Sequence, residues 1–527
     1  MLSEDKYFKT LTKDELWERY CGFLDLSIDE FMEIQKELLM DEIERVADST
    51  LGKKIMSNQK PKSVEEFRNV VPLTTYDDYE PYLSQKQDDA LAIKPYLWCH
   101  SAGRSGSFKW VPHSSEAVQR AVKNYIAGFI LCTANSKGEI NIGPGLRLLT
   151  VVAPAPYTSG AVVSAVAERF SMPIVPPLEE SASVGFRERI AKGFKMALKD
   201  GVDVIGALAS VLVKMGEQLS EQAQGIKFSA SMLHPKVATR LLRAWLISKR
   251  EKRPILPKDL WPAKGIFVGG LDTAIYKNDV AHYWGSQPFE FYAATEWLVA
   301  AMQAWNKKAM IFVPDMVFLE FLPFDEHKDD NSQLETVLLD DVEEDKLYEL
   351  VITQFYGMPL LRYRSNDLIK FTAMSDSGVG INLPQMAFQR RIDEIITIGG
   401  LIKLDEKTIW QAIANTGIKY NDWAAVREVV DNQLFLRLFI ELKKKRDASE
   451  LATMVDEQLK QIDIDYKDIE AYLNLQPVRV TLLSPGTFLR YAEEKTKEGA
   501  DIAHLKPPHV NAKEAVIKRL IQLSEGN

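Results

Sequence analysis

The stretch "GLRLLTVVAPAPYTSGAVVSAVAERF", residues 145–170, joins a short apolar run to an amphipathic segment across a turn that is rich in proline. The run before the prolines has the length of a buried strand, and the later segment spaces its apolar residues as a helix does. The pattern recurs in "VDVIGAL" (202–208), "ASVLVKMGEQLSEQA" (209–223) and "KGIFVGG" (264–270). Strand followed by helix, repeated over about residues 66–300, predicts an α/β sheet covered by helices on both faces.

Other patterns flank this region. Residues 1–60 space their apolar side chains three and four apart, which predicts helices. Residues 308–371 contain short β-prone runs between acidic turns, which predicts an antiparallel, barrel-like β subdomain. After a charged tetrad at 391–394, strands and helices mix again over 395–527, enough for a separate α+β domain. We therefore predict an α/β protein with a large N-terminal domain over residues 1–390, a boundary at 391–394 and a smaller C-terminal α+β domain.

Composition excludes several classes of protein. The chain has 527 residues and a formal charge of −9, with its basic residues dispersed, which argues against a nucleic-acid partner. Cys21, Cys99 and Cys132 include no close pair, so neither a disulfide framework nor a zinc site is indicated, and a reducing, cytoplasmic location is expected. No apolar tract is long enough for a bilayer span, and we expect no membrane partner.

The loop "SAGRSGSFK", residues 101–109, follows one strand-like run and precedes another. Glycines at 103 and 106 allow positive φ and let backbone N–H groups approach an anion, while serines and two cations add donors. The spacing is not that of a Walker loop. Because hairpin turns use the same residues, the loop alone leaves a turn and a phosphate site equally open.

Two later segments each place one carboxylate beside a strand. "YAATEW" (292–297) sets Glu296 after an aromatic, apolar run, and "YRSND" (363–367) sets Asp367 at the end of a hairpin strand. A carboxylate is a hard ligand that suits Mg²⁺, and an aspartate can accept hydrogen bonds from both hydroxyls of a ribose. Either acid by itself is also typical of a solvated surface.

The order of these segments resembles that of the adenylate-forming enzymes, which include acyl-CoA synthetases and firefly luciferase. More narrowly, four stretches resemble the auxin-responsive promoter family of acyl acid-amido synthetases. They are "VVPLTTYDDYEPYL" (70–83), "FLEFLP" (318–323), "YELVITQFYGMPLLRYRSNDLIKF" (348–371) and "SPGTFLRYAEEKTKEGADIAHLKPPHV" (484–510). The matches are collinear from about residue 15 to residue 510.

The resemblance implies a two-step ligase that uses ATP and Mg²⁺. A carboxylic acid attacks the α-phosphate of ATP, pyrophosphate leaves, and an amine, usually that of an amino acid, then takes the acyl group to form an amide and AMP. The implied partners are a small acyl acid and an amine. An acyl-CoA ligase with the same intermediate, and a nucleotide-binding protein without turnover, remain alternatives. The sequence does not indicate which acid or amine is used, nor the oligomeric state.

The resemblance also implies a role for individual residues. Those expected at the β- and γ-phosphates are Ser101, Gly103, Arg104, Ser105, Gly106 and Lys109. Those expected beside the adenosine are Gly269, Gly270, Tyr292, Ala293 and Asp367, which would take the ribose hydroxyls. Thr295 and Glu296 would lie at the α-phosphate and its Mg²⁺, with Glu296 as the metal ligand. Arg391 and Asp393 would form the hinge of a mobile C-terminal domain that carries the catalytic Lys506.

Two motifs depart from the superfamily pattern. Arg104 stands in the loop where a hydroxyl residue is usual, which either adds a cation to the pyrophosphate grip or impairs the site. Asn366 stands where glycine is usual, and asparagine is tolerated there if the position requires positive φ. No histidine has metal-ligand spacing, and we expect His100, His113 and His504 to be bystanders although each lies next to a motif residue.

Overall fold

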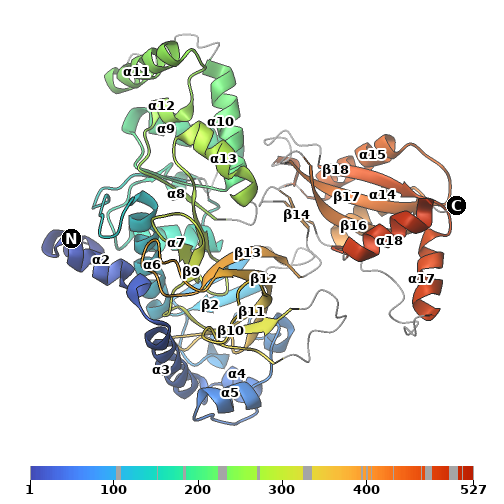
Figure 1. Ribbon diagram of the computed structural model, residues 1–527, viewed down its shortest axis with the longest axis horizontal. Helices are drawn as coiled ribbons and strands as arrows, with labels where there is room; N and C mark the ends of the chain where they lie inside the picture. Colours follow the sequence, from blue (N-terminus) through green and yellow to red (C-terminus); the bar gives the residue numbers. More distant parts are fainter. Residues whose placement is uncertain are drawn as a thin grey trace. The chain divides into compact units, whose positions relative to one another are not determined.

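The computed structural model separates into two compact units, Met1–Arg390 and Arg391–Asn527, which are described one by one (Figure 1). The structure describes residues 2–101, 109–150, 152–181, 186–223, 234–269, 273–324, 335–392, 396–398, 402–404, 406–430, 433–463, 466–468, 477–497, 509–512 and 514–525.

One eleven-stranded sheet organises the first unit, in the order β10-β11-β12-β13-β9-β8-β7-β6-β5-β3-β4. Its parallel half contains β3 (Leu148–Thr150), β4 (Ile174–Val175), β5 (Val204–Gly206), β6 (Gly265–Val268) and β7 (Phe289–Tyr292). Its other strands are β8 (Ala301–Gln303), β9 (Met310–Phe312), β10 (Val317–Pro323), β11 (Leu347–Gln354), β12 (Tyr363–Ala373) and β13 (Gln385–Arg391).

The predicted strand-and-helix alternation is confirmed. The runs around residues 148, 204 and 265 form β3, β5 and β6, which pair in parallel, and nearly every residue in them is buried, as a sheet covered on both faces requires. The β-prone runs after residue 308 form the antiparallel pairs β10·β11 and β11·β12. These strands continue the same sheet as the parallel ones, a relation that the sequence patterns did not specify.

The helices predicted over residues 1–60 are present. They are α1 (Ser3–Thr10), α2 (Lys13–Cys21), α3 (Ile28–Val46) and α4 (Thr50–Ile55), and α2 and α3 each begin with a capping box. The remaining elements up to the middle of the unit are η1 (Gly22–Asp25), α5 (Val64–Val70), η2 (Tyr76–Tyr79), η3 (Asp88–Ala90), α6 (Ser115–Thr133), α7 (Thr158–Ala167) and α8 (Leu178–Ser181). Helix α6 packs on β6 and β8, and α3 packs on β10.

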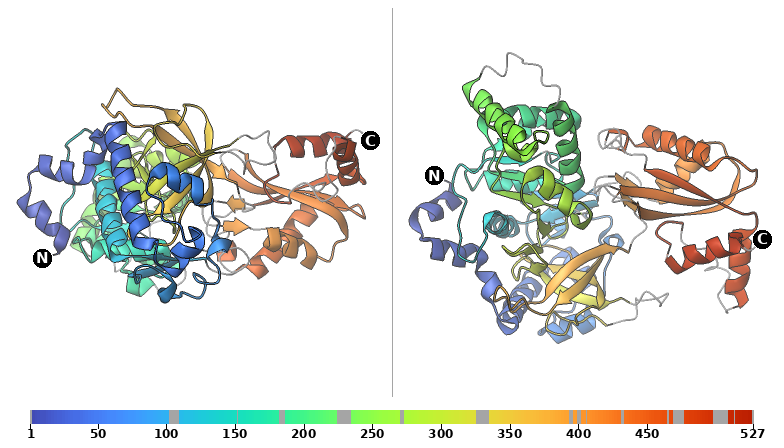
Figure 2. Two further views of the ribbon diagram at one scale, coloured as in Figure 1. Left: turned by 90° about the horizontal axis from the view of Figure 1, so that it is seen from below. Right: turned by 45° about the horizontal axis from the view of Figure 1, so that its top comes forward.

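A helical lobe follows in the chain. It contains α9 (Phe186–Asp200), α10 (Ala209–Ala223), α11 (Pro235–Glu251), α12 (Pro257–Leu260) and α13 (Thr273–Trp284) (Figures 1 and 2). Two buried tryptophans join these elements: Trp261 Nε1 donates to the Ala197 carbonyl at 3.0 Å, and Trp284 Nε1 donates to the Leu212 carbonyl at 2.9 Å. The lobe thus has a core of its own beside the sheet.

The second unit is built on a three-stranded sheet. Strands β16 (Tyr420–Val430) and β17 (Gln433–Leu442) are antiparallel, and β18 (Val478–Leu483) is parallel to β17. The other elements are β14 (Ile396–Ile398), β15 (Ile402–Leu404), α14 (Glu406–Asn415), α15 (Ala448–Ile462), α17 (Thr487–Lys497) and α18 (Glu514–Glu525). This α+β composition agrees with the strands and helices expected there.

The segment around His509 is held firmly to β16. The Ala425 amide donates to the His509 carbonyl at 2.6 Å, and the Asn511 amide donates to the Ala425 carbonyl at 2.9 Å. The His509 ring stacks on Trp423 with centroids 4.5 Å apart, and its two nitrogens lie 2.5 Å from Glu406 Oε1 and 2.8 Å from Asp422 Oδ1. These two carboxylates raise the pKa of His509 by accepting its N–H groups.

No helix in the described part of the chain combines the length and the apolar content needed to cross a membrane.

Candidate active site

The predicted phosphate loop is flanked by the two strands expected around it. Strands β1 (Leu97–Ser101) and β2 (Lys109–His113) pair antiparallel, with Ser101 opposite Lys109. Lys109 Nζ lies 5.3 Å from the centre of the Tyr76 ring. Four of the predicted loop residues, Gly103, Arg104, Ser105 and Gly106, lie outside the described residues.

A tight turn follows the last parallel strand, and it contains Thr295 and Glu296. The Leu298 amide donates to the Ala294 carbonyl at 2.8 Å, and Leu298 has a φ of 61°. The Ala300 amide donates to the Tyr292 carbonyl at 2.8 Å, which closes the turn at the carboxyl end of β7. In α/β sheets this end of the strands is where ligands bind.

Thr295 is tied to two other elements of the unit. Its hydroxyl lies 2.8 Å from the hydroxyl of Thr158, the first residue of α7. Its carbonyl accepts a hydrogen bond from His113 Nε2 at 2.8 Å. Burial lowers the pKa of His113 to about 4, so the ring is neutral near pH 7 and the proton lies on Nε2. This hydrogen bond joins the end of β2 to the turn that carries Glu296, and our expectation that His113 takes no part in the chemistry stays a prediction.

Glu296 is also held through its backbone. Its carbonyl accepts a hydrogen bond from Gln354 Nε2 at 2.7 Å. Its half-buried side chain has no hydrogen bond or ion pair with the described residues. Burial chiefly raises the pKa of Tyr76, and the negative charges of Glu80 and Glu296 add to the increase.

Asp367 and Tyr292, 75 residues apart in sequence, are in direct contact. Tyr292 Oη donates to Asp367 Oδ2 at 2.6 Å, and both side chains are buried. Asn366 has a φ of 60°, the left-handed conformation that we expected of an asparagine in place of glycine. The Asp367 amide donates to Ser365 Oγ at 3.0 Å, which fixes the strand just before the carboxylate.

The remaining predicted residues divide into described and undescribed ones. Ala293 is exposed beside Tyr292. Gly269 follows β6, and a Cβ built there would lie 3.1 Å from the Phe291 ring, so close packing on β7 already favours glycine at this position. Arg391 ends β13. Gly270, Asp393 and Lys506 lie outside the described residues.

The contacts missed by sequence reasoning are those of Thr158, His113 and Gln354. Each touches the turn at Thr295 and Glu296 from an element 58 to 182 residues away in the chain. The sequence offered one feature that could have indicated such a contact, which is the position of His113 a few residues after the loop.

Among the described residues, no group of three or more His, Cys, Asp or Glu side chains could hold a metal ion. A magnesium ion on a nucleotide needs few protein ligands, because phosphate oxygens and water fill the other positions. A single carboxylate such as that of Glu296 is chemically sufficient for that requirement.

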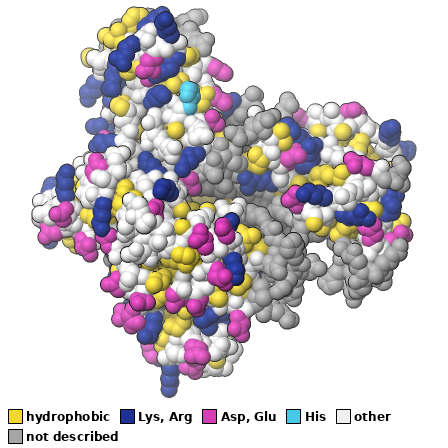
Figure 3. All heavy atoms as spheres, in the orientation of Figure 1, with side chains coloured by type: hydrophobic (Ala, Val, Ile, Leu, Met, Phe, Trp, Pro, Cys, Tyr) yellow, Lys and Arg dark blue, Asp and Glu magenta, His cyan; other side chains and the backbone are white. Residues whose placement is uncertain are grey.

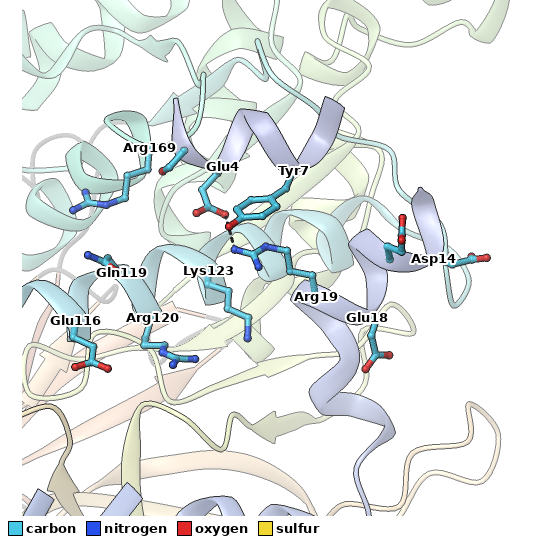
Figure 4. A pocket seen from close by; sticks show the side chains of 12 residues that line it. Glu4, Tyr7, Asp14, Glu18, Arg19, Glu116, Gln119, Arg120, Lys123 and Arg169 are labelled. Atoms are coloured by element: carbon cyan, nitrogen blue, oxygen red, sulfur yellow. Dashed lines mark ion pairs between the residues drawn. The ribbon is translucent and has the colours of Figure 1, made fainter. Parts of the chain in front are cut away.

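A separate polar cavity of about 1080 Å³ lies among α1, α2 and α6 (Figure 4). None of the predicted site residues lines it. Its charges are partly matched internally, since Arg19 lies over the Tyr7 ring at 3.5 Å and 3.8 Å from Glu4. The cavity is therefore distinct from the predicted nucleotide site.

The fold is that of the adenylate-forming ligases. An acyl acid amido synthetase, AtGH3.15 in complex with 2,4-DB, superposes with a TM-score of 0.53 at 19% identity, over 97% of each chain. A 2-hydroxyisobutyryl-CoA ligase in complex with 2-HIB-AMP and CoA gives 0.55 at 14% identity, over 97% of this chain and 93% of the ligase.

The chain belongs to the GH3 family: the family's N-terminal domain matches residues 22–172, its central domain residues 310–391 and its C-terminal domain residues 407–515. The predicted resemblance is thereby confirmed. A GH3 domain-containing protein of Mus musculus is 27% identical over 52% of each chain. Indole-3-acetic acid-amido synthetase GH3.3 of Arabidopsis thaliana is 28% identical over 37% of this chain and 33% of its own length. The chain thus spans a third to a half of the length of these two relatives.

Proposed function

We propose that the chain is an ATP-dependent ligase that activates a small carboxylic acid as an acyl adenylate and transfers the acyl group to an amine, most simply that of an amino acid. The observation that carries the proposal is the 2.6 Å contact between Tyr292 and Asp367, which joins two separately predicted adenosine residues at the carboxyl end of β7. Membership of the GH3 family and the amido synthetases among its relatives support the same activity.

The reaction has two displacements. In the first, a carboxylate oxygen attacks the α-phosphorus of ATP and the bond to the β-phosphate breaks, releasing pyrophosphate. In the second, the amine nitrogen attacks the acyl carbon, the bond to AMP breaks and the nitrogen loses a proton. Both steps build negative charge on oxygen, which positioned cations and N–H groups stabilise.

Individual residues are proposed for each part. Asp367 accepts the ribose hydroxyls, and Tyr292 orients it by donating to its other oxygen. Thr295, held between Thr158 and His113, contacts the α-phosphate. Glu296 holds Mg²⁺, which when bound offsets phosphate charge.

The remaining proposed residues bind phosphate or serve the C-terminal unit. The loop from Ser101 to Lys109 binds the β- and γ-phosphates, with Arg104 as an added cation, and Gly269 and Gly270 border the adenine with Ala293. Arg391 and Asp393 serve as the hinge, and Lys506 stabilises the transferring charge.

We also propose a cytoplasmic location. The three cysteines are free and buried, and burial raises the pKa of each thiol. Free, buried thiols suit a reducing compartment. Cell fractionation with compartment markers tests the location, and recovery in a secreted or organellar fraction would contradict it.

The activity is tested by incubating the protein with ATP, MgCl₂ and a panel of carboxylic acids, and by measuring the pyrophosphate released. Mass spectrometry of products formed with mixed amino acids, hydroxylamine or CoA then identifies the acceptor. Amides with AMP are expected. Thioesters alone would instead indicate the CoA ligase, and ATP binding without pyrophosphate release on any acid would indicate a binding protein.

Two substitutions test the residue assignments. Lys506→Ala should lower adenylation by roughly 10²- to 10³-fold, as loss of a group that stabilises transition-state charge does. Asp367→Asn should raise the KM for ATP. Asp345→Asn, an exposed acid in the turn before β11 whose side chain is 75% accessible, is the matched control and should change neither value.

A further inference from the structure

Helix α11 exposes three large apolar side chains on one face. Leu242, Trp245 and Leu246 are 58%, 49% and 55% exposed, and their spacing places them together on the outer side of the helix. No other helix in the described part of the chain exposes three such residues. Figure 3 shows hydrophobic and basic side chains mixed over the region of α11.

The opposite face of α11 is already packed. Val237 and Ala244 are buried, and Arg240 Nη1 donates to the Ala197 carbonyl of α9 at 3.3 Å. The helix is therefore held on the lobe by its inner face. Its exposed apolar residues are not needed for that packing.

The surroundings of the apolar face are strongly basic. Residues 235–264 contain nine lysines and arginines and two acids, a formal charge of +7 in a chain whose total is −9. On α11 the exposed cations are Lys236, Arg243, Lys249 and Arg250. Lys249 Nζ lies 5.9 Å from the centre of the Trp245 ring, so a cation lies beside the apolar group.

The single acid of α11 is neutralised locally. Glu251 Oε2 accepts a hydrogen bond from Arg253 Nε at 2.7 Å. The second acid of the segment, Asp259, accepts two hydrogen bonds from the same guanidinium, at 2.7 and 2.9 Å. Neither carboxylate offsets the exposed cations of the outer face.

We propose that α11 is a docking surface for an anionic lipid bilayer. Trp245, Leu242 and Leu246 enter the boundary between headgroups and acyl chains, and the flanking lysines and arginines pair with lipid phosphates and carboxylates. Tryptophan and leucine beside Lys and Arg on one helix is the composition of helices that lie in the membrane interface. Such contact needs no spanning helix, so it differs from the membrane partner that the sequence argued against.

A second copy of the chain is a poorer occupant. In a two-fold dimer the same patch meets itself, so the exposed lysines and arginines of α11 in the two copies would face each other and repel. A lipid surface that carries negative charge has the complementary sign, and each basic residue near it contributes attraction that salt weakens. The proposal is independent of the ligase activity.

The test is flotation of the full-length protein with vesicles of phosphatidylcholine, with and without phosphatidylserine, at low and high salt. We expect binding only to vesicles that contain phosphatidylserine, and weaker binding at high salt. Trp245→Gln combined with Leu246→Gln should lower the affinity at least about tenfold, because two apolar side chains no longer enter the lipid. Since both residues are half exposed, the thermal midpoint should not change.

Trp410→Gln is the matched control, because Trp410 is 48% exposed on α14, away from the basic segment in sequence. It should bind vesicles as the unchanged protein does. Three results would overturn the proposal: no vesicle binding by the unchanged protein, equal loss in the Trp410 variant, or concentration-dependent dimers in light scattering that Trp245→Gln abolishes.

Discussion

Arg362→Met removes one partner of a fully buried ion pair and should strongly destabilise the N-terminal unit. Arg362 is 7% exposed and Glu320 is fully buried. The guanidinium donates to Glu320 at 2.9 to 3.2 Å, and its Nη1 also donates to the carbonyls of Arg68 at 2.5 Å and Val71 at 2.7 Å. Arg362, which immediately precedes β12, thus joins β10 to α5 and to the residue that follows α5.

The magnitude follows from what Glu320 retains. Leaving a buried charge without its partner costs about 3–5 kcal/mol. Here Arg68 Nε still lies 3.5 Å from the carboxylate, and Thr336 Oγ1 still donates to it at 2.7 Å. We therefore expect a loss near the lower limit, about 3 kcal/mol.

The assay is calorimetric unfolding of the whole protein, with attention to the transition of the N-terminal unit. Lys370→Met is the control, because Lys370 lies on β12, the strand that Arg362 immediately precedes, but pairs at 2.8 Å with Asp345 at an exposed site, where a pair contributes less than about 1 kcal/mol. Adding Glu320→Gln to Arg362→Met should recover part of the loss. A loss no larger than that of Lys370→Met would refute the reasoning.

Three further predictions concern titratable groups, of which Glu42 and His113 are buried and His509 is partly exposed. Burial raises the pKa of Glu42 to about 8 although the carboxylate accepts from the Gly357 amide, so the folded state holds a proton that the unfolded chain releases, and stability falls as pH rises from about 4.5 through 8. Glu42→Gln should remove this loss of stability. In denaturant titrations the free energy of unfolding of the variant should rise by roughly 4 kcal/mol relative to that of the unchanged protein between these two pH values, and parallel pH dependences would contradict the prediction. His113→Phe should cost about 1–3 kcal/mol by leaving the Thr295 carbonyl without its donor, and the unchanged protein should show no His113 titration by NMR near pH 7, since its pKa is about 4. His509, whose pKa is raised in the folded state, should stabilise the C-terminal unit at pH values below its unfolded pKa of about 6.5, and this effect should be lost as pH rises through the folded pKa. His509→Gln should therefore weaken the pH dependence of the thermal midpoint of that unit over this range. An unchanged pH dependence would contradict the prediction.

Much of the fold could be predicted because local patterns determine it. The apolar runs at β3, β5 and β6 and the capping residues of α2 and α3 are visible in neighbouring residues alone. The positive φ of Asn366 could also be expected, because glycine is usual at that position in the resemblance.

The supporting contacts of the site could not be predicted in the same way. The hydrogen bond from His113 to Thr295 joins residues 182 positions apart, and the contact of Gln354 with Glu296 spans 58. The Gln354 contact depends on the order of strands in the eleven-stranded sheet, and the His113 contact depends on how the separate β1–β2 hairpin packs against that sheet. Composition and periodicity carry no information on either.

The attachment of His509 to β16 limits how far Lys506, three residues earlier in the chain, can move relative to that strand. Three residues of fully extended chain span about 10 to 11 Å. The backbone of Lys506 can therefore lie no farther than that from His509, which is attached to β16. Movement of one loop alone therefore cannot displace Lys506 by more than this distance. If Lys506 acts as proposed, a larger displacement would have to carry the three-stranded sheet of the C-terminal unit along with the residue.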